Sequence, residues 1–307
     1  MKASYQIWRD RRGRLSPLRV AALALLLVPV ALALEAWFSH RLAARLFNDL
    51  VHRTGYWALI FLVVALAITP LRRTGRFSGL LEVRRMIGVG AFVYATAHIL
   101  LYIADERFDL VKVASEIVKR LYLTIGLIAW LGLLALAATS TDAMVKRLGA
   151  LRWRRLHQAS YAIGVLSLVH FFQQTKADFT LPATVTGLFA WLMAYRLAAA
   201  RMQRSELSPL ALLVLTVTVA MLVMLGEALG IAAWYRVSPW RVLQTTFDFD
   251  LAVRPGWYVL AAGLGVVAMA WWRASRRWTL PPGARQPGDR SRAGGTPAAA
   301  LVPRQRP

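Results

Sequence analysis

Three of the five histidines lie within or at the start of long apolar stretches of the chain. His98 lies near the end of residues 81–103, and His157 and His170 bracket the apolar part of residues 152–172. Each stretch begins with basic residues and continues as an apolar run long enough for a membrane helix. Ionisable side chains at membrane depth are energetically expensive, so their presence indicates a functional site. Imidazole is a common metal ligand, and two histidines on neighbouring helices can hold one haem iron from both sides.

Helix geometry predicts the depth of each residue. His157 and His170 are 13 residues apart, which is about 20 Å at the rise of an α-helix. If both stretches cross in the same direction, His98 lies at the depth of His170, and these two histidines can share one iron. Arg84 then lies near the depth of His157. We expect Arg84 to meet a haem propionate, because arginine stays protonated and is an unusual metal ligand.

Each of these residues also has a simpler interpretation. A single intramembrane histidine is often a hydrogen-bonded packing residue, and the matching depths of His98 and His170 are what favour ligation. His157 follows RWRR and suits an interfacial role nearly as well, and Arg84 suits a basic membrane anchor. Because 13 residues turn an ideal helix by roughly 220°, haems at His157 and His170 would contact different sides of that helix. The sequence therefore leaves open whether one haem or two are bound.

The composition predicts an all-α polytopic membrane protein that positions these residues. The chain has 307 residues, of which 58% are hydrophobic, and it contains no cysteine. The lack of cysteine excludes disulfides, thiolate-ligated metals, iron–sulfur clusters and covalently attached c-type haem, so any metal centre must use His, carboxylate, Met or Tyr. Apolar runs of suitable length predict eight membrane spans. They are residues 19–39, 55–71, 86–104, 121–140, 157–173, 180–198, 209–233 and 256–273.

The distribution of basic residues predicts the orientation of these spans. When the segments between spans are assigned alternately to the two sides, 27 of the 38 Lys and Arg residues fall on the side of both termini. By the positive-inside rule, both termini are cytoplasmic. The net charge of +23 is then explained by topology, with anionic lipid as the natural partner, and nucleic acid is not needed to explain it.

Several motifs resemble the MsrQ (YedZ) family within the wider ferric-reductase-like transmembrane group. They are ITPLRR (68–73), VRRMIGVGAFVYATAHILLY (83–102), ATSTDAMVKRLGALRWRRLHQASY (138–161) and VLSLVHFF (165–172). The resemblance covers about residues 15–200. It implies a six-helix core in the bacterial inner membrane that binds b-type haem, with FMN as a further cofactor.

The resemblance also implies a function and partners. It implies electron transfer across the inner membrane to MsrP, a periplasmic molybdopterin enzyme that reduces methionine sulfoxide in proteins. The implied electron donor is the quinone pool or a cytosolic flavin reductase. The haem histidines of the family match His98, His157 and His170, and its inner-face arginine matches Arg84. The chain would thus be an electron-transfer subunit that does not itself act on methionine sulfoxide.

These observations predict four regions. Residues 1–18 are a basic cytoplasmic N-terminus, and residues 19–204 are the six-helix haem-binding core. Residues 205–275 form an additional two-helix membrane segment that compact family members lack. Residues 276–307 are a Pro-, Gly- and Arg-rich tail that we expect to be disordered and cytoplasmic. The tail is too short for a flavin or nicotinamide domain, so we expect the electrons to come from another molecule.

Other functions are compatible with a polytopic membrane protein, but the histidines distinguish between them. A haem b ferric reductase, or a cytochrome b subunit serving another periplasmic acceptor, would use the same histidines. A transporter would show inverted repeats, broken helices and charged residues at the midplane, and the sequence has no recognisable internal repeat. A purely structural membrane anchor would leave the matching depths of the histidines unexplained.

Overall fold

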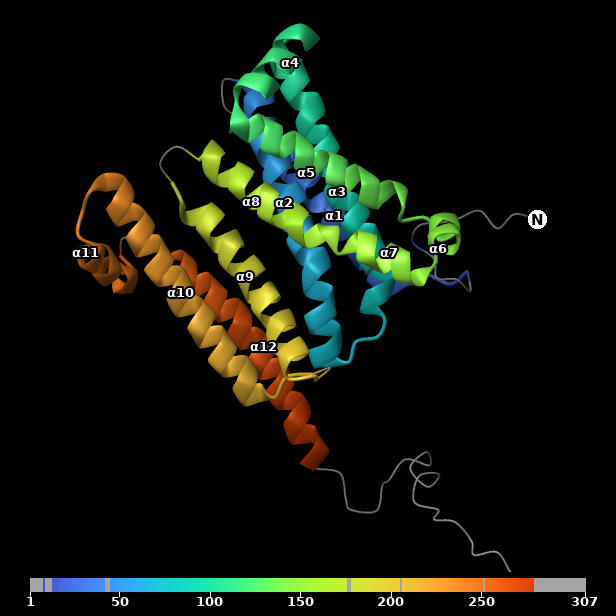
Figure 1. Ribbon diagram of the computed structural model, residues 1–307, viewed down its shortest axis with the longest axis vertical. Helices are drawn as coiled ribbons and strands as arrows, with labels where there is room; N and C mark the ends of the chain where they lie inside the picture. The colour runs from blue at the N-terminus through green and yellow to red at the C-terminus, as the bar shows by residue number, and fades with distance from the viewer. Residues whose placement is uncertain are drawn as a thin grey trace, which may run out of the picture.

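The protein folds as a bundle of α-helices (Figure 1), as described by a computed structural model. No β-strand occurs among the residues that the structure describes. These are residue 8 and residues 13–41, 45–175, 178–204, 206–250 and 252–278. Residues 279–307 of the predicted tail, and most of the predicted N-terminal region 1–18, lie outside them.

Within this part of the chain, seven helices are long and apolar enough to cross a membrane. They are α1 (Pro17–Phe38), α2 (Leu46–Gly75), α3 (Leu80–Asp105), α5 (Leu121–Ala138), α9 (Thr180–Arg201), α10 (Pro209–Tyr235) and α12 (Pro255–Trp278). They correspond to seven of the eight predicted spans. The prediction of an all-α polytopic membrane protein is therefore confirmed.

The remaining predicted span differs from expectation. The sequence predicts one helix through residues 152–172, but the structure divides this stretch at Gln158 into α7 (Ala150–His157) and α8 (Ala159–Gln174). The Ser160 hydroxyl donates a hydrogen bond to the carbonyl of His157 at 2.7 Å, beside the break. The 16 residues of α8 reach about 24 Å, less than the hydrocarbon thickness of about 30 Å. Helices α7 and α6 (Asp142–Leu148) continue beyond its inner end (Figure 1).

Helix α2 begins nine residues earlier than predicted, at Leu46 instead of residue 55. The polar residues Asp49, His52 and Arg53 made this segment resemble a loop. In the structure, Asp49 and Arg53 form an ion pair one helical turn apart, with Nε and Oδ2 separated by 2.7 Å. The additional turns extend α2 far enough to lie beside the C-terminal half of α3.

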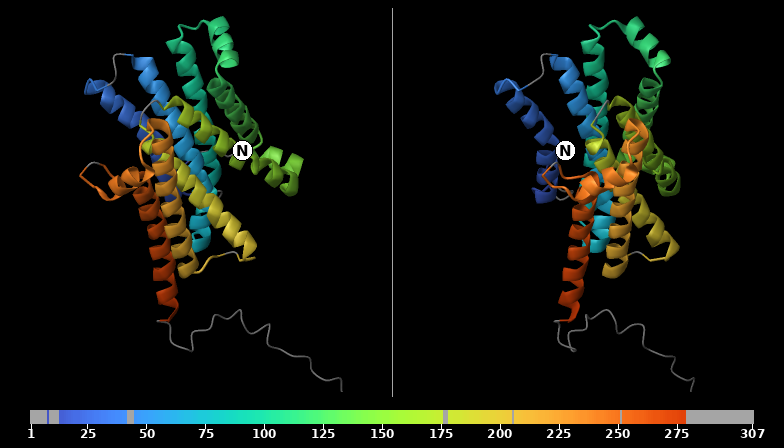
Figure 2. Two further views of the ribbon diagram at one scale, coloured as in Figure 1. Left: turned by 60° about the vertical axis from the view of Figure 1, so that its left-hand side comes forward. Right: turned by 90° about the vertical axis from the view of Figure 1, so that its left-hand side faces the viewer.

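The helices pack as two hairpins with further helices around them. Helix α2 packs along α3, and α5 packs along α8. One apolar core joins α1, α2, α3, α5 and α8, and its most buried members include Phe61 and Ala91. A second core joins α2 and α8 to α9, α10 and α12 around the fully buried Tyr195. Helices α10 and α12 thus lie on one side of the bundle against α9 (Figures 1 and 2).

Short helices occupy the connections at the end predicted to be outer. Helix α4 (Leu110–Lys119) connects α3 to α5, and its first turn is capped by the Asp109 side chain, which accepts from the Lys112 N–H. Helix α11 (Pro239–Gln244) and a short 3-10 helix (Thr245–Phe247) connect α10 to α12. Residues 104–120, whose apolar residues recur at a roughly helical spacing, thus contain a short helix outside the candidate spans.

At the opposite end, one carboxylate connects three parts of the chain. Glu206, in the connection from α9 to α10, pairs with Arg76 at the end of α2 and with Arg273 of α12. Burial would by itself raise the pKa of Glu206, but the hydrogen bonds from Arg273 and Arg76 outweigh it, so the pKa lies below its usual value. The two additional helices are thereby attached to the core through ion pairs as well as apolar packing.

A partly buried arginine compensates for a proline in α2. Pro70 has no N–H, so the carbonyl of Leu66 lacks its helical donor. The Arg196 guanidinium of α9 donates to this carbonyl at 2.6 Å and to the Leu192 carbonyl at 2.8 Å. It also lies over the ring of Tyr161, 5.4 Å from the centroid. Since Arg196 makes no ion pair with any described residue, carbonyl oxygens and an aromatic face stabilise its charge.

This arrangement predicts energetic coupling between Pro70 and Arg196. Replacing Arg196 with Met leaves the Leu66 carbonyl without a donor, which should lower the free energy of unfolding by about 1–3 kcal/mol. In a Pro70→Ala background, the restored backbone N–H satisfies that carbonyl, so Arg196→Met should cost less. Thermal unfolding of the four proteins in detergent, followed by circular dichroism, measures the coupling. Strictly additive losses would contradict the assignment.

Candidate haem-binding site

His98 of α3 and His170 of α8 face each other between the two hairpins. Their ring centroids are 6.2 Å apart, and the ring planes are nearly perpendicular at 88°. An imidazole nitrogen lies about 2 Å from a bound metal, and the ring centroid about 1 Å further, so two axial imidazoles have centroids about 6 Å apart. The structure thus brings together the two histidines that the sequence places at equal depth, at a separation that fits one iron between them.

Each of these histidines is held through its Nδ1 atom by a backbone carbonyl on the other helix of its hairpin. His98 Nδ1 lies 2.8 Å from the carbonyl oxygen of Val51 in α2, and His170 Nδ1 lies 2.7 Å from that of Tyr122 in α5. A carbonyl can only accept, so each Nδ1 carries the proton and donates it. The lone pair of each Nε2 is then free to bind a metal. Neither Nε2 is hydrogen-bonded to any described part of the chain.

A glycine lies behind each ring. Gly55 follows Val51 by one helical turn, and Gly126 follows Tyr122 by the same spacing. A Cβ at Gly55 would lie 2.8 Å from His98 Nδ1, and a Cβ at Gly126 would lie 2.9 Å from His170 Nδ1. Both distances are too short for a side chain, so only glycine lets the rings approach their carbonyls. The two hairpins therefore support their histidines in the same way, although the sequence has no recognisable repeat.

Aromatic contacts connect the hairpins around the histidine pair. Tyr56, next to Gly55, lies 6.3 Å from Phe171, next to His170, between ring centroids. Trp130 of α5 donates from Nε1 to the Thr96 hydroxyl of α3 at 3.0 Å. These contacts link α2 to α8 and α3 to α5, so the spacing between the two histidines depends on packing of the whole four-helix core.

His157 is placed differently. It ends α7, and its ring stacks on Trp153 with centroids 3.9 Å apart. Its Nδ1 lies 3.0 Å from the Trp153 carbonyl oxygen, and its Nε2 lies 3.3 Å from the Ser140 hydroxyl. Both nitrogens are thus engaged, and metal binding through Nε2 would require the Ser140 contact to be given up.

Arg84 lies near His157, as its predicted depth requires. Its charge acts on the His157 ring and on Arg196. The neighbouring Arg85 pairs with Asp142 of α6, whereas Arg84 makes no hydrogen bond or ion pair with the described residues. The charge of Arg73 also acts on Arg196. Uncompensated cations therefore gather near His157, and this arrangement suits the acidic groups of a cofactor.

Sequence reasoning missed Val51, Gly55, Tyr122, Gly126 and Arg196. The available signals were weak: single glycines in RTGYW and TIGLI, and one arginine inside a predicted span. None of them indicates by itself which histidine or carbonyl it will meet.

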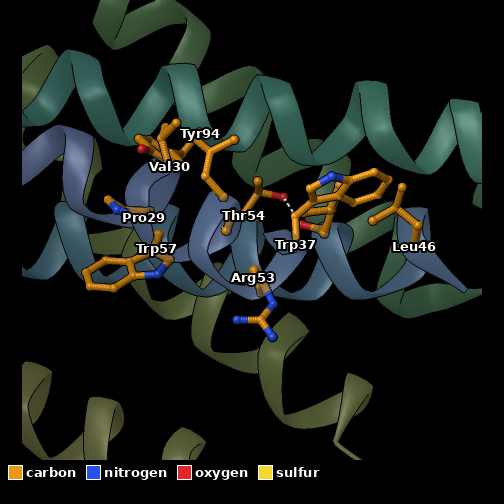
Figure 3. A pocket seen from close by; sticks show the side chains of 11 residues that line it. Pro29, Val30, Trp37, Leu46, Arg53, Thr54, Trp57 and Tyr94 are labelled. Carbon is orange, nitrogen blue, oxygen red and sulfur yellow. Dashed lines mark hydrogen bonds between the residues drawn. The ribbon is translucent and has the colours of Figure 1, made fainter. Parts of the chain in front are cut away.

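A separate pocket of about 260 Å³ lies between α1 and α2, near Tyr94 of α3 (Figure 3). Its walls include Pro29, Trp37 and Trp57, and its only charged residue is Arg53. Because Arg53 already pairs with Asp49, the pocket offers no uncompensated cation for a flavin phosphate.

Comparison with known proteins identifies similar chains. Residues 54–168 match the family described as ferric reductase like transmembrane component. The chain is 44% identical over 149 residues to a Xanthomonas oryzae pv. oryzae protein named protein-methionine-sulfoxide reductase heme-binding subunit MsrQ, covering 48% of this chain and 68% of that protein. A protein of the same name from Xanthomonas campestris pv. campestris is 40% identical over 185 residues, which are 58% and 84% of the two chains. One from Rhodospirillum rubrum is 38% identical over 208 residues, or 66% and 95%. No solved structure matches the chain.

The glycines behind the rings yield a prediction. Gly126→Ala introduces a Cβ that displaces His170 from the Tyr122 carbonyl, and loss of such a supporting contact typically weakens metal binding by about 10–100-fold. We expect Gly126→Ala and Gly55→Ala each to lose low-spin haem, measured by optical titration and electron paramagnetic resonance. Gly88→Ala is the control, since a Cβ there meets nothing within 4 Å. Unchanged haem affinity in both test variants would refute the role of the glycines.

Proposed function

Because the chain belongs to the family of haem-binding subunits (MsrQ) of protein-methionine-sulfoxide reductase, we propose that it carries electrons across a membrane through b-type haem. The observation that carries this proposal is the His98–His170 pair, with its centroid separation of 6.2 Å and its two carbonyl-held Nδ1 atoms. A partly buried pair of neutral imidazoles with free Nε2 atoms could hold one haem iron between them.

In this proposal, His98 and His170 ligate the iron through Nε2. Val51 and Tyr122 hold the Nδ1 protons, and Gly55 and Gly126 make room for the rings. The haem supplies reversible one-electron chemistry when bound. The protein fixes both ligands from opposite hairpins, so neither ring has to reorient when the charge of the centre changes.

We further propose an inner haem near His157. His157 would supply one ligand through Nε2 after exchange of the weak Ser140 contact, and Arg84 would pair with a propionate. This assignment is supported by the uncompensated charge of Arg84 beside His157. The contact between His157 Nε2 and the Ser140 hydroxyl is 3.3 Å, which is long for a hydrogen bond. It is therefore easier to replace than the 3.0 Å contact between His157 Nδ1 and the Trp153 carbonyl.

FMN remains a prediction from the family resemblance. Its phosphate would need cations, and the uncompensated arginines near the inner end, Arg73, Arg84 and Arg196, are the described residues that suit it best. An FMN phosphate and the two propionates of an inner haem would compete for these three arginines.

The proposed direction of electron flow rests on charge asymmetry. We propose that the chain lies in the bacterial inner membrane with both termini cytoplasmic, because most of its basic residues fall on that side. The quinone pool or a cytosolic flavin reductase would then supply electrons near His157, and a periplasmic MsrP-like molybdopterin reductase would accept them near His98 and His170. Residues 19–204 would form the conducting core, with residues 205–275 as an accessory segment.

The proposal predicts the consequence of removing either outer ligand. His98→Ala and His170→Ala should each abolish electron delivery, because one axial ligand is lost, while membrane insertion persists since alanine is cheaper than histidine in lipid. Haem content and methionine sulfoxide reduction are measured in proteoliposomes that contain a quinol or flavin-reductase donor and an MsrP-type acceptor on opposite sides. His52→Ala, an exposed histidine on α2, is the control. Normal delivery by both test variants would contradict the proposal.

A second prediction concerns the inner site. Arg84→Ala should loosen the inner haem, because removing one partner of a partly desolvated ion pair is costly. The outer low-spin signal should be retained, and Arg84→Lys should rescue only in part because lysine lacks the two-pronged donor geometry. Haem stoichiometry and electron paramagnetic resonance measure both. Arg85→Gln is the matched control, since Arg85 pairs with Asp142 instead. Selective loss of the outer signal would refute this placement of Arg84.

A further inference from the structure

The connection between α10 and α12 forms a concave, cationic site that the electron-transfer function does not use. Arg236, Arg241 and Arg254 all line one open pocket of about 690 Å³. They come from the end of α10, from α11 and from the residue before α12. Three arginines from three segments converge here, so the pocket is suited to an anionic ligand.

Arg254 is the fixed member of the set. Its Nη1 lies 3.3 Å from Oε1 of Glu227, and its Nη2 donates to the Thr245 hydroxyl at 3.0 Å. The Glu227 side chain is only 5% exposed, so this ion pair is anchored inside α10. The charge of Asp178 also acts on both partners. Arg254 is therefore positioned by the fold, and its charge is largely balanced.

Arg236 and Arg241 supply the unbalanced charge. Neither makes an ion pair with any described residue. Arg236 also ends α10 in the left-handed conformation, with φ of 55°, where glycine or asparagine is usually found. A bulky residue in this conformation is disfavoured by about 1 kcal/mol or more. Arg236 and Arg241 therefore give the pocket positive charge that no described carboxylate balances.

The surroundings of the pocket indicate the class of ligand. Ile231, one turn inside the end of α10, and Val242 of α11 form an apolar wall below the arginines. Trp234 and Trp240, on either side of the connection, are 68% and 65% exposed. Exposed tryptophans at the end of a membrane helix mark the headgroup region of a bilayer. The site therefore combines cations with apolar residues, beside exposed tryptophans of the kind found at headgroup depth.

We propose that this pocket binds an anionic glycerophospholipid such as phosphatidylglycerol. The lipid phosphate would lie among Arg236, Arg241 and Arg254, and the start of an acyl chain would lie along Ile231 and Val242. An acidic segment of a soluble partner fits the site less well, because exposed tryptophans at a helix end are typical of the bilayer interface and the pocket also offers apolar residues for an acyl chain. This inference is independent of haem binding.

The test uses the full-length protein purified in detergent and titrated separately with phosphatidylglycerol and zwitterionic phosphatidylcholine. Native mass spectrometry measures the bound lipid. We expect the wild type to prefer phosphatidylglycerol. Arg236→Gly should weaken its binding several-fold while relieving the backbone strain, and the Arg236→Gly, Arg241→Gln double variant should weaken it by about twentyfold.

Arg107→Gly is the matched control. Arg107 is also an exposed arginine in the left-handed conformation, with φ of 56°, but it lies between α3 and α4, outside the pocket. Its replacement should leave lipid binding unchanged. Equal binding by the wild type and the double variant, or an equal loss in Arg107→Gly, would overturn the proposal. Competition by inorganic phosphate or by a soluble acidic peptide as strong as that of phosphatidylglycerol would overturn the assignment to lipid.

Discussion

The hydrogen bond from a histidine Nδ1 to a backbone carbonyl of the neighbouring helix is the interaction on which the site depends. It is made twice, by His98 to Val51 and by His170 to Tyr122. Each bond sets the tautomer and the direction of the ring, so that Nε2 points away from the supporting helix. Each bond also requires two helices to approach closely. A glycine one turn after the accepting carbonyl makes this approach possible. Each of the hairpins α2–α3 and α5–α8 therefore holds one histidine in place. The contacts between the hairpins set the distance between His98 and His170, where a metal would bind.

The charges inside the bundle follow from the same need to satisfy polar groups away from water. Pro70 frees a carbonyl in α2, and Arg196 binds it from α9. This leaves a guanidinium without a carboxylate close to Arg84 and His157, where acidic cofactor groups would be stabilised. Other arginines at this end have a carboxylate partner: Asp142 pairs with Arg85, and Glu206 pairs with Arg76.

Helices α10 and α12 extend this core without changing it. They pack against α9 through a shared apolar core and are attached to α2 at one end through Glu206, and the Glu227–Arg254 pair joins them to each other at the opposite end. The segment is thus integrated into the bundle, yet its outer connection presents charges and tryptophans that no helix of the core covers. We therefore assign this segment a role in contacts with the lipid bilayer and not in electron transfer.

The sequence by itself determined the fold class, most of the spans and the family, because apolar length and motif order are local properties that survive without a structure. It also placed His98 and His170 at one depth, since helical rise is constant. Tertiary structure alone decided what holds them. A carbonyl is present at every residue and gives no sequence signal, and Val51 lies 47 residues from the histidine it binds. The early start of α2, the break at Gln158 and the role of Arg196 were hidden for a related reason. Each depends on a contact between particular side chains or carbonyls, within a helix as for Asp49 and Arg53 or between helices as for Arg196, and the residue types alone do not reveal it.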